Sequence, residues 1–192
     1  KLEQTVGMAF IVDDTANMLR EMEDAVVRIQ RVVKDLKGYA RVDTPDSDRL
    51  SIDQCVQHSA AVCAQIERET IHWQVQLGQT PAIVCRPAQL NELIMQLLRN
   101  AVQATAAEAT ITVLTRHENG DVVLEISDDG EGIPPQQLNQ VFEPFYTTRA
   151  VGPGQGRGLT RARAITLEHG GIIAINSTPG AGTTVTVRLP IT

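Results

Sequence analysis

The order of the periodic segments in residues 87–189 restricts the fold of this chain more than any other feature. Apolar residues first recur every three or four positions, as on one face of a helix, and then at every second position in two strand-like segments. A second helix-like segment and two further strand-like segments follow. Segments in this order typically pack as helices on one face of a mixed sheet. The predicted helices and strands are, in order, 87–101, 109–115, 121–126, 159–168, 171–176 and 183–189.

Local signals mark the ends of these segments. Pro87 suits the first turn of a helix, because the N–H that it lacks would have no helical partner there. Asn119-Gly120 is typical of the tight turn in a β-hairpin. Gly170 and Gly171 stand where the second helix should end. The chain thus predicts one hairpin and two well-delimited helices in this region.

The same domain extends upstream to about Arg49. A helix from Ile52 to Ile66 or Glu67, with Ser51 as its N-cap, precedes strands predicted at 72–77 and 82–85. Before them, the polar run 43–48 predicts a linker. We therefore expect a linker at 43–48 and a domain at 49–192.

Residues 1–42 are expected to form part of a dimerisation helix. Apolar and small residues recur there in alternating steps of four and three, which is the heptad pattern of a coiled coil. Such a stripe must pack against another helix, and the rest of the sequence has few heptads. We therefore expect a homodimer through this helix. The seam consists of Ile11, Thr15, Met18, Met22, Ala25, Ile29, Val32, Leu36 and Tyr39.

Asn100 interrupts an otherwise apolar helix. Gln96 lies four residues before it, so the two amides share one helix face. An amide oxygen is a suitable ligand for Mg²⁺, which prefers hard oxygen atoms and keeps several waters. Taken alone, an asparagine is more often a surface residue bonded to local backbone.

Two glycine-containing segments also suggest ligand contacts. Asp128 ends a strand just before Gly130 and Gly132, where the backbone can pass close to a flat ligand and the carboxylate can accept a hydrogen bond from an amine such as that of adenine. A calcium-like acidic turn or an ordinary tight turn has the same pattern. The glycine-rich run 152–158 precedes a helix, so its N–H groups and the helix dipole favour phosphate. A flexible loop would look the same, and Arg157 fits either alternative.

Together and in this order, the three motifs resemble the N, G1 and G2 boxes of the ATPase fold shared by gyrase, Hsp90, MutL and histidine kinases. Between the last two, residues 141–149 (VFEPFYTTR) resemble the F box of the histidine kinases. Residues 168–171 (EHGG) and 179–184 (PGAGTT) resemble the end of the kinase domain. The resemblance covers about 49–191. Upstream, residues 32–41 resemble the end of the kinases' dimerisation helix.

The resemblance implies a site for ATP and Mg²⁺. Asn100 would hold a Mg²⁺ ion that bridges the phosphates, and Asp128 would bind the adenine amine. Residues 143–157 would form a lid over ATP, with Phe142 and Phe145 anchored in the core. The nucleotide-binding residues that the resemblance implies are Asn100, Asp128, Gly130, Gly132, Ile133, Gly154, Gly156, Arg157, Gly158, Leu159 and Thr184.

Two departures from the family pattern bear on activity. Gln96 stands where the ATP hydrolases of this fold have a glutamate that activates water, and an amide cannot take up a proton near neutral pH. This disfavours a gyrase-like or MutL-like ATPase with vigorous hydrolysis. No phosphoacceptor histidine is evident, because every histidine lies in the nucleotide domain. Either a helix that carries it was removed, or the chain is naturally divergent. The histidines are His58, His72, His117 and His169.

Composition excludes several other classes of function. The net charge of −6 disfavours a general affinity for nucleic acid, which needs a basic surface. The three cysteines have no metal-binding spacing and are expected to be free core thiols in a reducing compartment. No apolar stretch approaches the ~18 residues of a membrane span, and no signal peptide is evident. We expect a cytoplasmic piece of a longer protein, in which a membrane anchor would lie outside this chain.

The sequence predicts an α+β two-layer sandwich preceded by a long coiled-coil-like helix. We expect the ATP-binding catalytic domain of a two-component sensor histidine kinase, which transfers the γ-phosphoryl group of ATP to a histidine not evident in this chain. Its expected partners are ATP or ADP and either a response-regulator receiver domain or a histidine-bearing hairpin. The alternative is a non-catalytic regulator that senses nucleotide or binds a partner with the same fold.

Overall fold

The computed structural model describes residues 48–66, 70–106, 108–144, 146 and 158–191. The predicted dimerisation helix and nearly all of the predicted linker lie outside the described residues. The helices are α2 (Ile52–Ile66), α3 (Pro87–Ala104), the 3₁₀ helix η1 (Pro135–Gln137) and α4 (Gly158–Glu168). The strands are β1 (Asp48–Leu50), β2 (Ile71–Gln76), β3 (Ile83–Cys85), β4 (Ala109–Glu118), β5 (Asp121–Asp128), β6 (Ile172–Ser177) and β7 (Thr183–Pro190).

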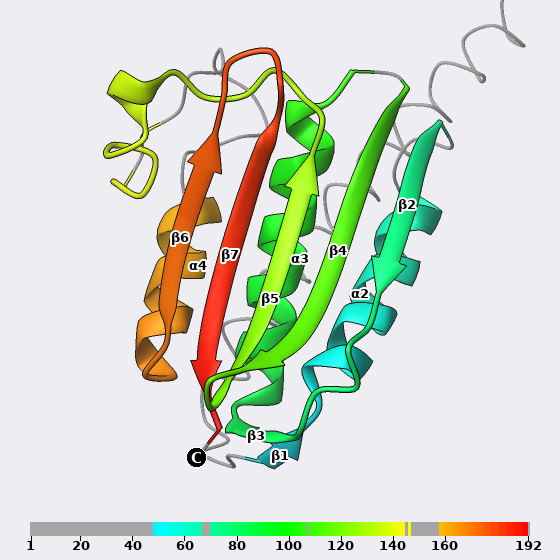
Figure 1. Cartoon of the computed structure of the whole chain (residues 1–192), viewed down its shortest axis with the longest axis vertical. Helices are drawn as coiled ribbons and strands as arrows, with labels where there is room; N and C mark the ends of the chain where they lie inside the picture. Colours follow the sequence, from blue (N-terminus) through cyan, green and yellow to red (C-terminus); the bar gives the residue numbers. More distant parts are fainter. Residues whose placement is uncertain (1–47, 67–69, 107, 145, 147–157, 192) are drawn as a thin grey trace, which may run out of the picture. The chain divides into compact units, whose positions relative to one another are not determined.

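Five strands form one sheet in the order β2-β4-β5-β7-β6. Strands β2 and β4 run parallel, and the other neighbours are antiparallel, so the sheet is mixed as predicted. Helices α2, α3 and α4 cover one face of this sheet (Figure 1). The short strands β1 and β3 form a separate antiparallel pair. The domain is therefore an α+β two-layer sandwich, which confirms the predicted fold class.

The hairpin between β4 and β5 sets which side chains face the helices. Asn119 and Gly120 have φ values of 53° and 87°, the left-handed backbone that a two-residue hairpin turn requires. The turn sets Glu118 opposite Asp121 and Ile111 opposite Asp128. Along β4, every second residue from Ala109 to Thr115 is buried. This alternation is what directs one face of the sheet toward the helices.

The core between the sheet and the helices is aliphatic. Both strands and helices contribute residues that are almost completely buried, and the largest of them are Ile52, Ile83, Leu90, Leu93, Ile94, Leu97, Leu98, Ile111, Leu124, Ile126, Ile165 and Leu189. The three cysteines are buried free thiols, as predicted. Burial and the neighbouring Cys85 raise the pKa of Cys55 to about 11, so this thiol is unreactive near neutral pH.

The other face of the sheet is polar and carries charged pairs. Arg116 bonds to Glu125 at 2.8 Å on the neighbouring strand. Arg188 of β7 lies 3.0 Å from Glu118 of β4. Rows of threonine accompany these pairs, for example Thr112 and Thr186. A polar face of this kind fits a sheet that is covered by helices on one side only.

A polar cluster ties the start of α2 to the sheet. The Asp53 carboxylate accepts hydrogen bonds from the Thr80 N–H at 2.7 Å, the Thr80 hydroxyl at 3.1 Å and the Thr115 hydroxyl at 2.5 Å. Gly78 donates its N–H to the Thr115 hydroxyl oxygen at 3.0 Å. Thr80 and Thr115 are both buried and cannot form hydrogen bonds with bulk water, so the Asp53 carboxylate serves as their hydrogen-bond acceptor.

The structure differs from the sequence prediction mainly at short or edge segments. Strand β1 was not predicted, and it includes Asp48, the last residue of the predicted linker, which pairs with Cys85. Its sequence, Asp-Arg-Leu, has neither the alternation of apolar and polar residues nor the β-branched side chains that indicate a strand. Strands β4 and β5 are also longer than predicted. Polar residues extend β4 up to the hairpin turn, and Ser127 and Asp128 extend β5 at the opposite end, where they pair with Thr112 and Ile111 of β4. Within the described part of the chain, no helix is both long and apolar enough to span a membrane.

Candidate functional site

Four chain segments meet at one end of the sandwich. The second half of α3, the end of β5, the start of α4 and the β6–β7 turn all lie at the upper end of the domain in Figure 1. Three of the predicted site residues, Asn100, Asp128 and Gly158, belong to these segments. The fold therefore brings together positions that are up to 58 residues apart in the sequence.

Asn100 faces the first residue of α4. A Cβ atom added at Gly158 would lie 3.0 Å from the Asn100 Oδ1 atom and 3.3 Å from the Gln96 Oε1 atom. Gly158 therefore allows the backbone at the helix N-terminus to approach both amides closely. The Asn100 Nδ2 atom is buried and has no hydrogen-bond partner among the described residues. A buried donor without a partner is costly, so this amide is suited to a group that arrives from outside.

The Asp128 carboxylate lies on the helix-facing side of the sheet. Because side chains alternate along a strand, Asp128 lies on the same face of β5 as the buried residues Leu124 and Ile126. Burial raises its pKa, whereas hydrogen bonds from the backbone of Gly130 and Thr183 act in the opposite direction. The Gly130 N–H donates to Asp128 Oδ1 at 3.0 Å. Such a carboxylate is held in a fixed position and can accept a further N–H from a ligand.

The turn after Asp128 packs tightly against two other segments. A Cβ at Gly130 would collide with the backbone carbonyl of Ala104, and one at Gly132, whose φ is 68°, would collide with the carbonyl of Thr178. Glu131 donates its N–H to the Ala104 carbonyl oxygen at 3.1 Å. Through these contacts, residues 130–132 connect the end of α3 to the β6–β7 turn. The fold therefore requires glycine at positions 130 and 132 whether or not a ligand binds.

Ile133 is held by the same β6–β7 turn. Its N–H donates to the Ser177 hydroxyl oxygen at 2.8 Å, and Ser177 in turn donates to the carbonyl oxygen of Gly182 at 2.9 Å. Gly182 has a φ of 88°, and a Cβ there would collide with the Asp128 carbonyl. Neither Ser177 nor Gly182 was predicted as a site residue, although the PGAG turn motif marks the position of Gly182.

Thr184 lies on the opposite face of the sheet from Asp128. It pairs with Ser127, and their hydroxyl oxygens are 2.8 Å apart. Thr183 pairs with Asp128 and is buried, on the same side as Val185. The threonine that lies beside Asp128 is therefore Thr183. The parity of the apolar residues in β7 is the sequence signal that distinguishes the two threonines.

The remaining predicted residues divide between α4 and the undescribed segment. Leu159 packs against the core from the first turn of α4. Gly154, Gly156, Arg157 and Phe145 lie outside the described residues. Phe142 is only partly buried: the Arg163 guanidinium lies 5.6 Å from the centre of its ring. Its neighbour Val141 is the buried side chain in that stretch.

The donor atoms near Asn100 suit a magnesium–phosphate group better than a metal held by the protein alone. Asn100 and Gln96 offer hard amide oxygens, and no cluster of three or more His, Cys, Asp or Glu residues occurs in the described part of the chain. Mg²⁺ commonly takes one or two protein ligands and completes its shell with waters and phosphate oxygens. The residues present therefore fit that ion.

Comparison with known proteins agrees with this geometry. Residues 85–192, more than half of the chain, match the family described as histidine kinase-, DNA gyrase B-, and HSP90-like ATPase. The sensor histidine kinase ZraS of Salmonella typhi is 30% identical over 167 residues, which are 85% of this chain and 36% of ZraS. The chain thus spans about a third of the length of that relative.

Two solved structures are similar to the domain and extend the comparison. Full-length ShkA in complex with AMPPNP has a TM-score of 0.71 and 20% identity, over 85% of this chain and 36% of that one. The histidine kinase ThkA in complex with the response regulator TrrA has a TM-score of 0.68 and 19% identity, over 88% of this chain and 49% of that one. At this identity the structures support the fold. The family match over more than half of the chain shows that the chain belongs to the histidine kinase-, DNA gyrase B- and HSP90-like ATPase family, and within that family it is similar to the catalytic domains of sensor histidine kinases.

Proposed function

We propose that ATP binds with its adenine at Asp128 and its phosphates between Asn100 and the start of α4. The observation that carries this proposal is the Asn100 amide, which faces the backbone at Gly158 and whose buried Nδ2 atom has no partner among the described residues. A helix N-terminus presents free N–H groups and a favourable dipole to phosphate. The structure of ShkA with AMPPNP supports nucleotide binding by a domain of this fold.

At the adenine end, the Asp128 carboxylate accepts a hydrogen bond from the exocyclic amine. Thr183, rather than Thr184, takes the role that was expected for the threonine, because it is buried next to Asp128. Gly130, Gly132 and Ile133 form the wall of the adenine pocket. Gly132 and Ile133 are held in place by the β6–β7 turn.

At the phosphate end, Gly158 and Leu159 supply backbone N–H groups from the first turn of α4, where such groups have no partner within the helix. Gly154, Gly156 and Arg157 complete the phosphate contacts. Mg²⁺, when bound, neutralises the phosphate charge and is held by the Asn100 Oδ1 atom, with Gln96 beside it. These assignments rest on the family resemblance and on the contacts of Asn100.

The reaction is transfer of the γ-phosphoryl group to a histidine imidazole, with ADP as the leaving group. The domain contributes positioning and charge stabilisation, which carry most of the catalysis in phosphoryl transfer. Gln96 cannot act as a base for water, so hydrolysis of ATP to free phosphate is slow. None of the four histidines lies on a helical hairpin of the described domain, and the His169 ring is already bonded to Ile165 and Arg86. The acceptor histidine is therefore supplied by another segment or chain.

The partners of the whole protein follow from the same proposal. A response-regulator receiver domain receives the phosphoryl group from the histidine, and the complex of ThkA with TrrA supports docking of such a protein on this fold. A homodimer forms through residues 1–42. Sedimentation of the chain as a monomer at micromolar concentration would contradict the dimer.

A trans-phosphorylation assay tests the proposed activity. The chain is incubated with Mg²⁺, ATP labelled on its γ-phosphate and a separately purified histidine-bearing helical hairpin of a sensor kinase. We expect label on the hairpin histidine and none on the chain itself. An Asp128→Asn chain is the matched control and should transfer no label. Nucleotide binding without any transfer would favour the non-catalytic regulator, and rapid release of free phosphate would favour an ATPase.

A further inference from the structure

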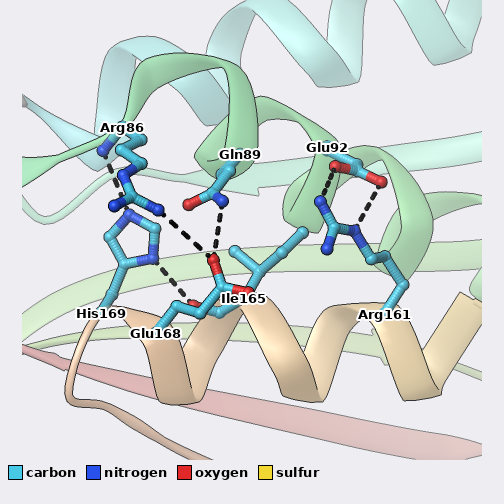
Figure 2. A network of polar contacts seen from close by, with 7 residues as sticks. All are labelled: Arg86, Gln89, Glu92, Arg161, Ile165, Glu168 and His169. Carbon is cyan, nitrogen blue, oxygen red and sulfur yellow. Dashed lines mark hydrogen bonds and ion pairs between the residues drawn. The ribbon is translucent and has the colours of Figure 1, made fainter. Parts of the chain in front are cut away.

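Helices α3 and α4 run antiparallel and touch through polar pairs at successive levels. Figure 2 shows these pairs between the two helices. Residue numbers fall along α3 as they rise along α4, from Asn100 beside Gly158, through Glu92 with Arg161, to Gln89 with Glu168. Each of these contacts therefore forms only at a particular axial position of α4 relative to α3.

Few of the α4 side chains that pack against the core are completely buried. The buried residues of α4 are Ala162, Ile165 and Thr166, of which only Ile165 is large, and Leu159 packs against the core while only partly buried. Leu167 is 59% exposed. Small side chains give a smooth surface with few interlocking ridges. The polar pairs must therefore contribute to the register between the helices.

The pair nearest the phosphate end is also the one with the most restrictive geometry. Arg161 donates through Nε to Glu92 Oε1 and through Nη2 to Glu92 Oε2, both at 3.0 Å. Two parallel bonds between planar groups fix direction as well as distance. Arg161 follows Gly158 by three residues, less than one helical turn, so the pair holds the end of α4 that faces Asn100.

A second level fixes the far end of α4. His169 Nδ1 lies 2.8 Å from the Ile165 carbonyl oxygen, so Nδ1 carries the proton and Nε2 accepts the Arg86 N–H at 3.1 Å. Glu168 accepts from the Gln89 amide at 2.7 Å and lies 3.6 Å from Arg86 Nη1. Both ends of α4 are thus held by polar contacts in the arrangement that places Gly158 beside Asn100.

We infer that the Glu92–Arg161 ion pair is a positioning pair for the phosphate end of the nucleotide site. It sets the axial position of α4 so that the N–H groups at Gly158 and Leu159 point into the space beside Asn100. A slide of one helical turn would move them by about 5.4 Å, and misplacement by about 1 Å already weakens a positioned contact. The inference rests on the proposed function, because it assigns the phosphates to this space.

A direct role of Arg161 as a phosphate ligand makes a different prediction. If Arg161 bound phosphate itself, neutralising Glu92 would remove a competing carboxylate and leave affinity unchanged or higher. If the pair acts by positioning, the Glu92→Gln substitution weakens binding although it removes a negative charge near the phosphates. Glu92→Gln therefore separates the two mechanisms, and the charge swap Glu92→Arg with Arg161→Glu tests whether the pairing itself matters.

Calorimetric titration of the full chain with two probes tests the inference. AMPPNP with Mg²⁺ engages adenine and phosphate positions, whereas adenosine engages the adenine position alone. A well-formed surface ion pair contributes at most about 1 kcal/mol, which corresponds to an affinity change of about fivefold. We expect Glu92→Gln and Arg161→Gln to weaken AMPPNP binding by about three- to fivefold and to leave adenosine binding unchanged. The charge swap should restore at least half of the loss.

Arg188→Gln is the matched control. It removes an ion pair to Glu118 of the same 3.0 Å length and similar exposure on the far face of the sheet. Its affinity for both probes should equal that of the wild type, and thermal denaturation of every variant checks folding. Unchanged or tighter AMPPNP binding by Glu92→Gln, or an equal loss for both probes, would overturn the inference while the proposed function stands. If the wild type binds neither probe, the proposed function fails and the inference with it.

Discussion

Replacing Asn100 with alanine should stabilise the nucleotide-free domain while weakening its binding of Mg²⁺ and AMPPNP. The Asn100 Nδ2 atom is a buried donor without a partner among the described residues, and such a donor costs about 1–3 kcal/mol. Alanine is also a better helix former than asparagine by up to about 0.7 kcal/mol. We therefore expect the free energy of unfolding to rise by about 1–3 kcal/mol, and Tm by roughly 3–10 °C.

Affinity should change in the opposite direction. A hydrogen bond to a charged group contributes about 1.5–3 kcal/mol, so its loss should weaken binding by about 10- to 150-fold. Thermal denaturation with and without Mg²⁺ and AMPPNP measures both effects, since ligand that binds only the native state raises Tm with its concentration relative to Kd. The wild type should gain the larger ligand-induced shift, and Asn100→Ala the higher Tm without ligand.

Asn91 provides a matched control on the same helix. Its Oδ1 atom is also buried and unpartnered among the described residues, nine positions before Asn100. Asn91→Ala should likewise stabilise the nucleotide-free domain, but it should leave the ligand-induced shift unchanged. A nucleotide-free Asn100→Ala domain that is less stable than the wild type would show that Asn100 serves the fold rather than a ligand.

Three further predictions follow from single contacts. Gly182→Ala should lower the free energy of unfolding by at least about 2 kcal/mol in urea denaturation, because a Cβ there would collide with the Asp128 carbonyl. Gly120 has nearly the same φ but no atom near its Cβ position, so Gly120→Ala should lower the free energy of unfolding by about half as much. Asp53→Ala should cost about 2–3 kcal/mol in the same assay, since it leaves the buried Thr80 donors without this partner. Because burial raises the pKa of Asp128 above 3.8, the contribution of Asp128 to the free energy of unfolding should fall as pH rises from 3.8 through the raised pKa. Nucleotide affinity should rise over the same range, and Asp128→Asn, measured over that pH range, should show neither change.

Much of this fold could be predicted because periodicity and turn residues agree along the chain. The helix that begins at Pro87 and the hairpin at Asn119-Gly120 each have a local signal strong enough to define the element. Strand β1 has no such signal, since its three residues are stabilised by pairing with β3, and that pairing is set by tertiary structure. Short edge strands of this kind are decided by neighbours rather than by their own residues.

For the candidate site, too, the sequence indicates which residues matter, but the fold determines which of them lie together. The sequence indicates that Asn100, Asp128 and Gly158 carry special roles, but only the fold brings Gly158 against Asn100. The choice between Thr183 and Thr184 depends on which face of β7 meets Asp128, and a motif match alone does not resolve a shift of one residue. The Glu92–Arg161 pair has no sequence signal, because its members lie 69 residues apart.

We propose above that this domain binds adenine nucleotide through Asp128. Calorimetric titration of the wild-type and Asp128→Asn chains with ADP and Mg²⁺ measures this binding. We predict saturable binding by the wild type with one site per domain, and at least about tenfold weaker binding by a variant that remains folded, as expected for the loss of a hydrogen bond to a charged group. Equal affinity of the two chains would show that Asp128 does not bind the nucleotide, and no binding by a folded wild type would show that the domain has no nucleotide site.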